Sequence, residues 1–152
     1  MEKSTLCYCI NEEQILLGLK KRGFGCDKLN GYGGKIEENE SPLMATIREL
    51  KEESGLITSE DNLKQVALIH FYFDENHVFD CYVFLLYVWK GNPIETEEMS
   101  PQWRSIANLP FDEMWIDDAM WMPLILAGEK IEAEIKLSAD GLTVKEFNYK
   151  PL

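Results

Sequence analysis

The sequence lacks the long apolar runs of membrane proteins and the excess of positive charge of proteins that hold long nucleic acids. Its longest apolar run, Val83–Trp89, is far too short to cross a bilayer or to form a signal peptide. It has 15 Lys and Arg residues and 27 Asp and Glu residues, which gives a formal net charge of −12. No basic stripe is available to release counterions from long nucleic acid. We expect a soluble, cytoplasmic monomer. Its anionic ligands are expected to be small and to be bound by a metal ion or a few lysines.

Cysteine is scarce as well, with four residues at Cys7, Cys9, Cys26 and Cys81. They form no C-x-x-C pair and no histidine cluster stands near them, which argues against a cysteine zinc site. A disulfide framework belongs to secreted chains and is not expected in this one. We therefore expect four ordinary buried or half-buried thiols.

The organisation that is present indicates one domain over residues 1–152. The hydrophobic content of 45% is enough for a single core, and no repeat, low-complexity tract or linker divides the chain. Alternating and β-rich segments predict a first hairpin, two longer strands, a short strand and a closing hairpin with its turn at Asp140-Gly141. These segments are 5–10 with 14–20, then 63–73, 78–89 and 102–106, and finally 131–137 with 142–149.

Two helices are expected between these strands. Ser41-Pro42 is a good helix start, because the serine oxygen can cap free amides and proline fits the first turn. Apolar residues follow at helical spacing, and Gly55 supplies a left-handed stop. A second helix is expected from Asp117 to Ala127, where acidic residues suit the positive helix end. Strands before, between and after two helices predict an α+β fold, a mixed sheet with helices on its faces.

Three glutamates of the first helix share one side of it. Glu49, Glu52 and Glu53 are spaced i, i+3 and i+4, which places their carboxylates within an arc of about 100°. Carboxylates so close repel one another, and a divalent cation removes that repulsion. Hard oxygen ligands select Mg²⁺ or Mn²⁺. For the triplet alone, the alternative is a solvated helix face in which Arg48 and Lys51 balance the acids.

The spacing of residues around this helix decides between a cation site and a solvated helix face. Counted from a glycine, the constrained positions are Gly34, Glu40, Arg48, Glu49, Leu50, Glu52, Glu53, Gly55 and Leu56. They match the Nudix signature G-x5-E-x7-R-E-U-x-E-E-x-G-U without a gap, where U is aliphatic, so the chain resembles the Nudix hydrolases. This resemblance implies an α/β/α sandwich with a central mixed β-sheet. It also implies that a metal-activated water cleaves a nucleoside diphosphate linked to another group.

The resemblance also assigns the metal ligands and the catalytic groups. Glu49, Glu52, Glu53 and the carbonyl of Gly33 are implied to bind Mg²⁺, for which Mn²⁺ is a substitute. Glu98, in a distant acidic loop, resembles an extra glutamate that many members add, and its alternative is an exposed loop acid. Arg48 can pair with a neighbouring carboxylate and hold it in place. Glu53 is the favoured proton acceptor, with Glu52 and Glu98 as rivals.

Three further segments bear on the substrate. Lysines and Arg22 in segments 20–25 and 28–35 form a local positive patch that can meet phosphates, or else a solvated loop. Trp115 can stack on a purine, and the pair Asp117-Asp118 can donate to and accept from a base edge if it shares a proton. The alternatives are a core tryptophan and an ordinary helix start. Asn30 offers the donor and the acceptor that a purine edge requires.

Taken together, these segments resemble the MutT-like oxidised purine nucleoside triphosphatases of the Nudix family. The strings LLGLKKRGFG, LNGYGGK, the signature, EEM before PQW, and PF-DEMW-DD-MW-PL recur in order. The resemblance implies hydrolysis of 8-oxo-dGTP or 2-oxo-dATP to the monophosphate and pyrophosphate, which sanitises the nucleotide pool. The implied substrate contacts are Thr5, Lys20, Phe24, Asn30, Tyr32, Gly34, Lys35, Trp115, Asp117 and Asp118. Segment 71–79 and the C-terminal hairpin match less well, and Ile116 replaces a proline.

Other activities remain open at this point. A Nudix pyrophosphatase acting on dNTPs, ADP-ribose or dinucleoside polyphosphates would carry the same signature. A non-catalytic nucleotide-binding module would be expected to have lost one of the signature acids, and none is missing. An RNA-decapping enzyme is disfavoured, because the chain is acidic and has no basic tract.

Overall fold

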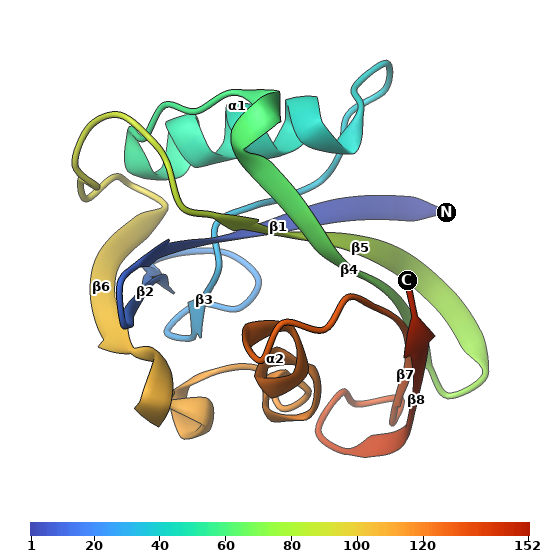
Figure 1. Ribbon diagram of the computed structural model, residues 1–152. Helices are drawn as coiled ribbons and strands as arrows, with labels where there is room; N and C mark the ends of the chain where they lie inside the picture. Colours follow the sequence, from blue (N-terminus) through green and yellow to red (C-terminus); the bar gives the residue numbers. More distant parts are fainter.

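The computed structural model describes all 152 residues, and its centre is a strongly curved mixed sheet (Figure 1). The strand order is β3-β2-β1-β5-β4-β7-β8, and β6 pairs with β2. The pairs β1·β5 and β4·β7 are parallel and the others are antiparallel. The strands are β1 (Glu2–Asn11), β2 (Gln14–Lys20), β3 (Leu29–Asn30), β4 (Leu63–Phe73), β5 (Asn76–Leu86), β6 (Met99–Ser105), β7 (Ile131–Leu137) and β8 (Val144–Pro151).

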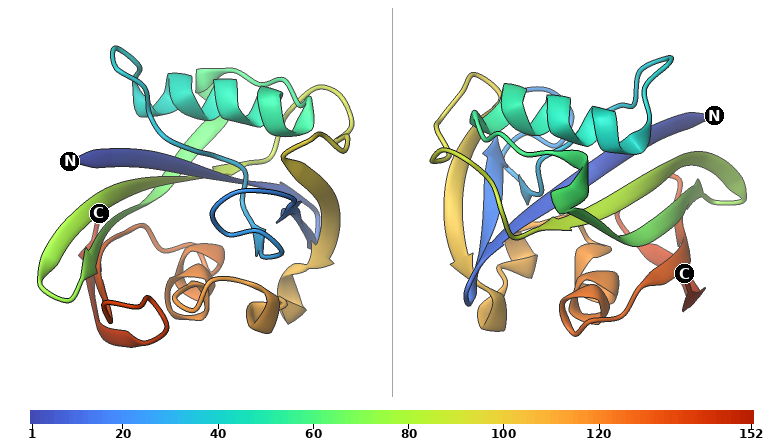
Figure 2. Two further views of the ribbon diagram at one scale, coloured as in Figure 1. Left: turned by 180° about the vertical axis from the view of Figure 1, so that it is seen from behind. Right: turned by 45° about the horizontal axis from the view of Figure 1, so that its top comes forward.

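Two α-helices lie on opposite faces of this sheet (Figures 1 and 2). They are α1 (Pro42–Ser54) and α2 (Asp118–Leu126). The short 3₁₀ turn η1 (Glu60–Asn62) lies between α1 and β4, and η2 (Ile106–Asn108) and η3 (Phe111–Glu113) lie between β6 and α2. One core cluster lies under α1 and includes Leu50, Cys7 and Phe84. A larger cluster includes Trp121 and Ile125 of α2. The predicted sandwich with a central mixed sheet is confirmed.

Helix α1 has the boundaries that its sequence predicts. The Ser41 hydroxyl accepts a hydrogen bond from the Met44 N–H at 3.1 Å, which satisfies one free amide of the first turn. Gly55 ends the helix in the left-handed region with φ of 79°, and its N–H donates to the Lys51 carbonyl. Leu50 is fully buried against the sheet. The apolar stripe therefore fixes which side of the helix the glutamates occupy.

Several strand boundaries differ from the predictions. Strand β1 begins at Glu2 instead of Thr5, β5 begins at Asn76 instead of Val78, and β8 spans Val144–Pro151 instead of 142–149. The strand expected to reach Trp89 ends at Leu86, and Tyr87 and Val88 are exposed, because the chain leaves the sheet and Lys90 bridges to Ile57. The short strand expected from Gln102 begins at Met99. It pairs with β2 from its first residue and accommodates Pro101, which is tolerated on an edge strand. The predicted strands 63–73 and 131–137 are confirmed at both ends.

All four cysteines are free, and three of them are buried as expected. Cys26 is exposed, contrary to the expectation of a buried or half-buried thiol, because it lies in the loop between β2 and β3. None of the helices has the length and the apolar character required to span a membrane.

Candidate active site

The glycine-rich segment 31–35 is bound to strand β1 by backbone hydrogen bonds. Cys7 and Tyr32 exchange bonds of 2.6 and 3.0 Å, and the Thr5 N–H donates to the Gly34 carbonyl at 2.9 Å. A Cβ atom on Gly33 would lie 1.8 Å from the Thr5 carbonyl oxygen, so no side chain fits there. This close approach fixes the Gly33 N–H, which donates to Oε1 of Glu53 at 2.9 Å.

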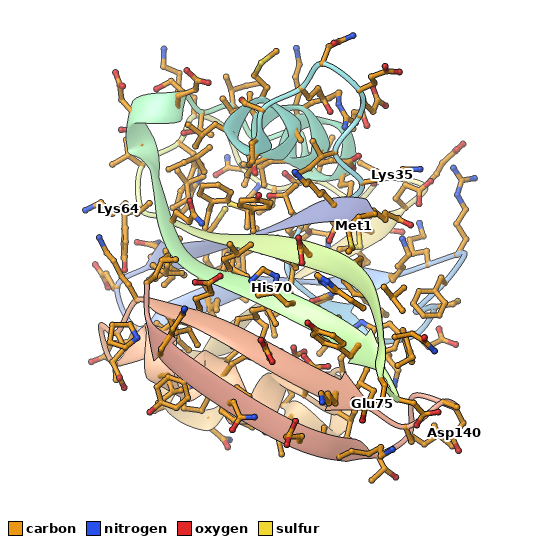
Figure 3. All side chains as sticks on the ribbon, turned by 90° about the vertical axis from the view of Figure 1, so that its right-hand side faces the viewer. Met1, Lys35, Lys64, His70, Glu75 and Asp140 are labelled. Atoms are coloured by element: carbon orange, nitrogen blue, oxygen red, sulfur yellow. The ribbon has the colours of Figure 1, made fainter.

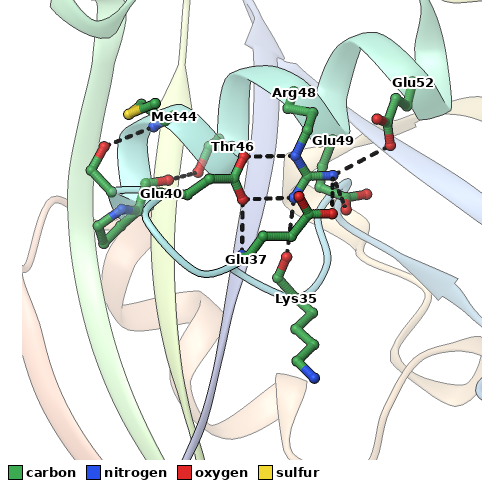
Figure 4. A network of polar contacts seen from close by, with 10 residues as sticks. Lys35, Glu37, Glu40, Met44, Thr46, Arg48, Glu49 and Glu52 are labelled. Carbon is green, nitrogen blue, oxygen red and sulfur yellow. Dashed lines mark hydrogen bonds and ion pairs between the residues drawn. The ribbon is translucent and has the colours of Figure 1, made fainter.

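Arg48 joins this loop to helix α1 (Figure 4). Its Nε and Nη2 atoms donate to the two carboxylate oxygens of Glu40 at 2.7 and 2.9 Å, a bidentate pair. Nη1 donates to Glu49 at 2.8 Å, and Nη2 donates to the Lys35 carbonyl at 3.1 Å. The hydrogen bonds from Arg48, with one from the backbone of Glu37, lower the pKa of Glu40 to about 2. Arg48 therefore holds both ends of the signature segment together.

Glu53 is the buried member of the glutamate triplet, with 6% of its surface exposed. Burial raises the pKa of Glu53 to about 8; the Gly33 N–H opposes this rise, and the charge of Glu49 adds to it. The pKa of Glu49 is also raised, chiefly by burial. Burial removes the water that would stabilise the negative charges of these two neighbouring carboxylates. A bound cation or a proton can stabilise them instead.

The predicted metal ligands share an all-oxygen donor set, which fits a hard divalent cation. Glu49 and Glu52 lie within reach of Arg48, whose Nη1 is 3.4 Å from Glu52. Glu98 accepts hydrogen bonds from Arg22 at 2.7 and 2.9 Å. In this conformation no three of the glutamates bring ligand atoms within 4.8 Å of one another. The side chains of Glu52 and Glu98 are 60% and 38% exposed, so both can rotate.

A cleft of about 510 Å³ opens beside Glu53. Segments far apart in the sequence line it, and they include most of the residues predicted to bind substrate: Thr5, Lys20, Phe24, Asn30, Gly34, Lys35, Trp115, Asp117 and Asp118. Gly33 and Glu53 lie at its border, so the cleft connects the glutamate helix with the predicted base-reading residues. Its apolar lining includes Ile69, Phe71 and Phe79, which the sequence analysis did not assign. Their alternation along β4 and β5 was the available signal.

Asp117 and Asp118 lie at the start of α2 and are only 5% and 2% exposed. Oδ2 of Asp117 accepts from the indole N–H of Trp121 at 2.9 Å, and Oδ2 of Asp118 accepts from the Trp115 backbone N–H at 3.2 Å. Burial raises the pKa of both carboxyl groups, and the charge of Asp117 raises that of Asp118 further. A proton retained on the pair makes it both a donor and an acceptor.

Asn30 is held in place by hydrogen bonds to its side-chain oxygen. Oδ1 accepts from the Gly31 N–H at 2.9 Å and from the Tyr8 hydroxyl at 3.4 Å. Because its oxygen is engaged, the amide N–H donors of Asn30 are the groups left for a ligand in the cleft. This arrangement places an amide donor in the same cleft as the carboxyl pair.

An aromatic pair stands at the mouth of the cleft. Phe24 is 82% exposed and stacks on Trp115 with 5.1 Å between ring centroids and 30° between planes. Lys28 Nζ lies 5.4 Å from the centroid of the Trp115 ring. A flat apolar surface so exposed suits stacking on a planar base.

The side chains of three predicted site residues make contacts that the sequence did not predict. The Tyr32 side chain is fully buried in the α1 core cluster, and its hydroxyl has no hydrogen-bond partner. Tyr32 therefore does not line the cleft. The Thr5 hydroxyl hydrogen-bonds with that of Thr46 in α1. Glu98 is paired with Arg22 and stands 4.0 Å from Lys20 Nζ, across from the glutamate helix.

Comparison with known proteins first identifies the fold. A MutT protein from Bacillus halodurans superposes with a TM-score of 0.84 over 100% of this chain and 99% of its own, at 20% sequence identity. The NUDIX domain family matches residues 2–135. This chain belongs to the Nudix hydrolase family, whose members use a divalent metal.

Two curated relatives carry the same more specific name. "Oxidized purine nucleoside triphosphate hydrolase" of Danio rerio is 39% identical over 142 residues, 93% of this chain and 90% of the relative. The protein of that name from Mus musculus is 41% identical over 133 residues, 87% of this chain and 84% of the relative. The "8-oxo-dGTP diphosphatase" of Escherichia coli K12 is 32% identical over 57% of this chain and 65% of its own length.

Proposed function

We propose that this chain is a Mg²⁺-dependent hydrolase that converts oxidised purine nucleoside triphosphates, such as 8-oxo-dGTP and 2-oxo-dATP, to the monophosphate and pyrophosphate. The observation that carries the proposal is a single cleft lined both by Glu53 of the glutamate helix and by Asn30, Asp117 and Asp118. The names of the zebrafish and mouse relatives support the same substrate class.

The base end of the cleft suits an oxidised purine. Both substrates carry an added carbonyl next to a ring N–H group. A carboxyl pair that retains one proton presents the complementary pattern, with an O–H for the carbonyl and a carboxylate oxygen for the N–H. The raised pKa values of Asp117 and Asp118 favour this half-protonated state. Phe24 and Trp115 offer the stacking surface.

The phosphate end carries the hydrolysis. A divalent cation, when bound, neutralises phosphoryl charge and lowers the pKa of an attacking water. Glu49, Glu52, Glu53 and the Gly33 carbonyl would hold it, with Glu98 as a further ligand. We assign Glu53 as the proton acceptor, with Glu52 and Glu98 as rivals, because Glu53 lines the cleft and burial raises its pKa to about 8. Arg48 is a positioning residue, since it contacts Glu40 and Glu49 rather than the cleft.

The proposal extends to the organisation of the protein. We take residues 1–152 as a single domain that acts as a monomer in the cytoplasm. The edge strand β8 supports the monomer, because Lys145, Glu146, Lys150 and Pro151 discourage pairing with a second sheet. The four free thiols fit a reducing compartment.

A screen of pyrophosphate release tests the function. We expect kcat/KM for 8-oxo-dGTP or 2-oxo-dATP to exceed that for dGTP or dATP by about tenfold or more, the scale of a few differential hydrogen bonds. Removing Mg²⁺ with EDTA should abolish turnover. Glu53→Gln should lower kcat by about 10²-fold or more, as loss of a general base does. The matched control, Glu38→Gln, removes an exposed acid of the same signature that makes no side-chain contact, and should keep full activity.

The same screen also tests the substrates of the competing activities. Faster hydrolysis of unmodified nucleotides, ADP-ribose or dinucleoside polyphosphates would overturn the substrate assignment and leave the hydrolase assignment intact. Tight nucleotide binding with no turnover of any compound would indicate a non-catalytic binding module.

A further inference from the structure

A second cluster of metal-binding side chains lies on the face of the sheet that points away from the cleft. Figure 3 shows His70 near the centre of this face, on the strand β4. His70 stands opposite Asp80 of β5, while Ile69 and Phe71 on either side of it line the cleft. Because side chains alternate along a strand, the two sets occupy opposite faces. His77, from the start of β5, completes the group.

The ligand atoms of three residues converge. Oδ1 of Asp80 is 2.5 Å from Nδ1 of His70 and 2.7 Å from Nε2 of His77. All three atoms lie within 4.8 Å of one another. The other nitrogen of the His70 ring, Nε2, is 2.8 Å from Oε2 of Glu132 on β7. One carboxylate oxygen of Asp80 therefore contacts both imidazole rings, and the carboxylate of Glu132 contacts the far side of the His70 ring.

The contact with Glu132 leaves the other nitrogen of His70 directed at the remaining two residues of the cluster. When the His70 Nε2–H donates to Glu132, the neutral ring has a lone pair at Nδ1, which faces the Asp80 carboxylate. Two electron-rich atoms at that separation require a proton or a metal ion between them.

The rings are already held in position. The His77 ring stacks on Tyr72 with 4.7 Å between centroids, and Lys136 Nζ covers the Tyr72 ring at 5.8 Å. The His70 ring meets the edge of His77 at 5.5 Å. The side chains of His70, His77 and Asp80 are 20%, 28% and 14% exposed, so an ion can reach them from solvent. A site with fixed rings and an open side needs little reorganisation to bind a cation.

We propose that His70, His77 and Asp80 bind a transition-metal cation of the Zn²⁺ class, with Glu132 fixing the tautomer of His70. Two imidazole nitrogens and one carboxylate oxygen are ligands that Zn²⁺ accepts, with water in the fourth position. Ligands about 2.1 Å from a tetrahedral ion lie about 3.4 Å apart, so the present contacts open by less than about 1 Å. A carboxylate behind a ligating histidine is the usual support of such sites. The all-oxygen glutamate site selects Mg²⁺ instead.

Calorimetric titration of the whole, metal-free protein with Zn²⁺ in excess Mg²⁺ tests this site. We expect one equivalent of Zn²⁺ to bind. Asp80→Asn and His77→Gln should weaken binding at least tenfold, and Glu132→Gln should weaken it about 10- to 100-fold. Glu134→Gln is the matched control, because Glu134 lies two residues along β7 from Glu132, faces His70 across the strand pair, and forms no hydrogen bond or ion pair with the cluster. Its affinity should equal that of the unchanged protein.

Two results would overturn the proposal. One is the absence of Zn²⁺ binding, or binding that survives Asp80→Asn together with His77→Gln. The other is binding that Glu52→Gln abolishes, since the ion would then occupy the glutamate site.

A measurement on the unchanged protein covers the case in which variants fail to fold. The chain has only two histidines, so its imidazole NMR signals belong to this cluster alone. One equivalent of Zn²⁺ should shift the signals of both rings together. Rings that respond to pH and ignore Zn²⁺ would show a network that binds protons only, contrary to the proposal.

Discussion

Individual carboxyl groups of this protein occupy opposite electrostatic environments within one small fold. Glu40 accepts two hydrogen bonds from Arg48, and its pKa falls to about 2. Glu53 is buried next to Glu49, and its pKa rises to about 8. Asp118 is buried next to Asp117, and its pKa rises as well. Glu40 therefore has a structural role in an ion pair. Glu53 and Asp118 are suited to binding and releasing a proton or a cation.

The Asp117–Asp118 pair makes the stability of the protein depend on pH. A pKa raised in the folded state contributes stability that is fully present below the ordinary pKa of about 3.9 and is lost as pH rises through the folded value. Asp118→Asn keeps an oxygen for the Trp115 N–H and cannot ionise. We expect it to be more stable than the unchanged protein at pH 8, by about 1.4 kcal/mol for each unit of raised pKa, and equally stable at pH 4.

Urea denaturation at the two pH values measures this difference. Asp112→Asn, which removes an exposed carboxylate of the nearby turn η3, serves as the control and should show no such change. Lower stability of Asp118→Asn at pH 8 would mean that the pair is fully ionised and stabilised by contacts.

Physical reasoning from spacing alone predicts residue roles only where the contacts are local, whereas the distant residues of the cleft, such as Asn30 and Trp115, were predicted through the family resemblance. The spacing of Glu49, Glu52 and Glu53 places them on one side of a helix without any knowledge of the fold. Glu98 and Arg22 are 76 positions apart, and their ion pair depends on how two loops meet. The contact between His70 and Glu132, 62 positions apart, depends on strand register in the same way. The histidine cluster was therefore not visible in the sequence.

Elements with chemical start and stop signals were the most predictable. Helix α1 begins after Ser41 and ends at Gly55 because a hydroxyl cap and a left-handed glycine define its ends. The end of β5 carries no such signal: Tyr87 and Val88 are as β-prone as the residues before them. The chain turns away there because Lys90 pairs with Ile57, a contact that sequence periodicity does not encode. Strand β3 was missed because it has two residues within a glycine-rich loop.

The cap of α1 provides a prediction at the scale of an element. Ser41→Ala removes the acceptor of the Met44 N–H and should cost about 1 kcal/mol of folding free energy. Ser59 holds the corresponding position before η1 but makes no capping hydrogen bond, so Ser59→Ala should cost clearly less. Urea denaturation of both variants gives the comparison. Equal losses would show that the Ser41 cap contributes nothing specific.

The whole molecule carries a net charge of −12 and a buried glutamate, and both make bound cations stabilising. General screening by salt and specific binding can be separated at matched ionic strength. MgCl₂ should raise the melting temperature more than NaCl does, since a ligand at 100 times its Kd adds about 2.7 kcal/mol of stability. Glu53→Gln should remove the difference between the two salts, and EDTA should reverse it in the unchanged protein. An equal effect of both salts would exclude a specific Mg²⁺ site.

The alternation of β4 has a consequence for how this gene can change. Ile69 and Phe71 belong to the wall of the cleft, while His70 between them belongs to the histidine cluster on the other face. Substitutions at odd and even positions are therefore nearly independent, and selection can adjust one face without disturbing the other. Loss or gain of a single codon within the strand would exchange the two faces at once. Homologous sequences should therefore differ in residue type along this strand more often than in its length.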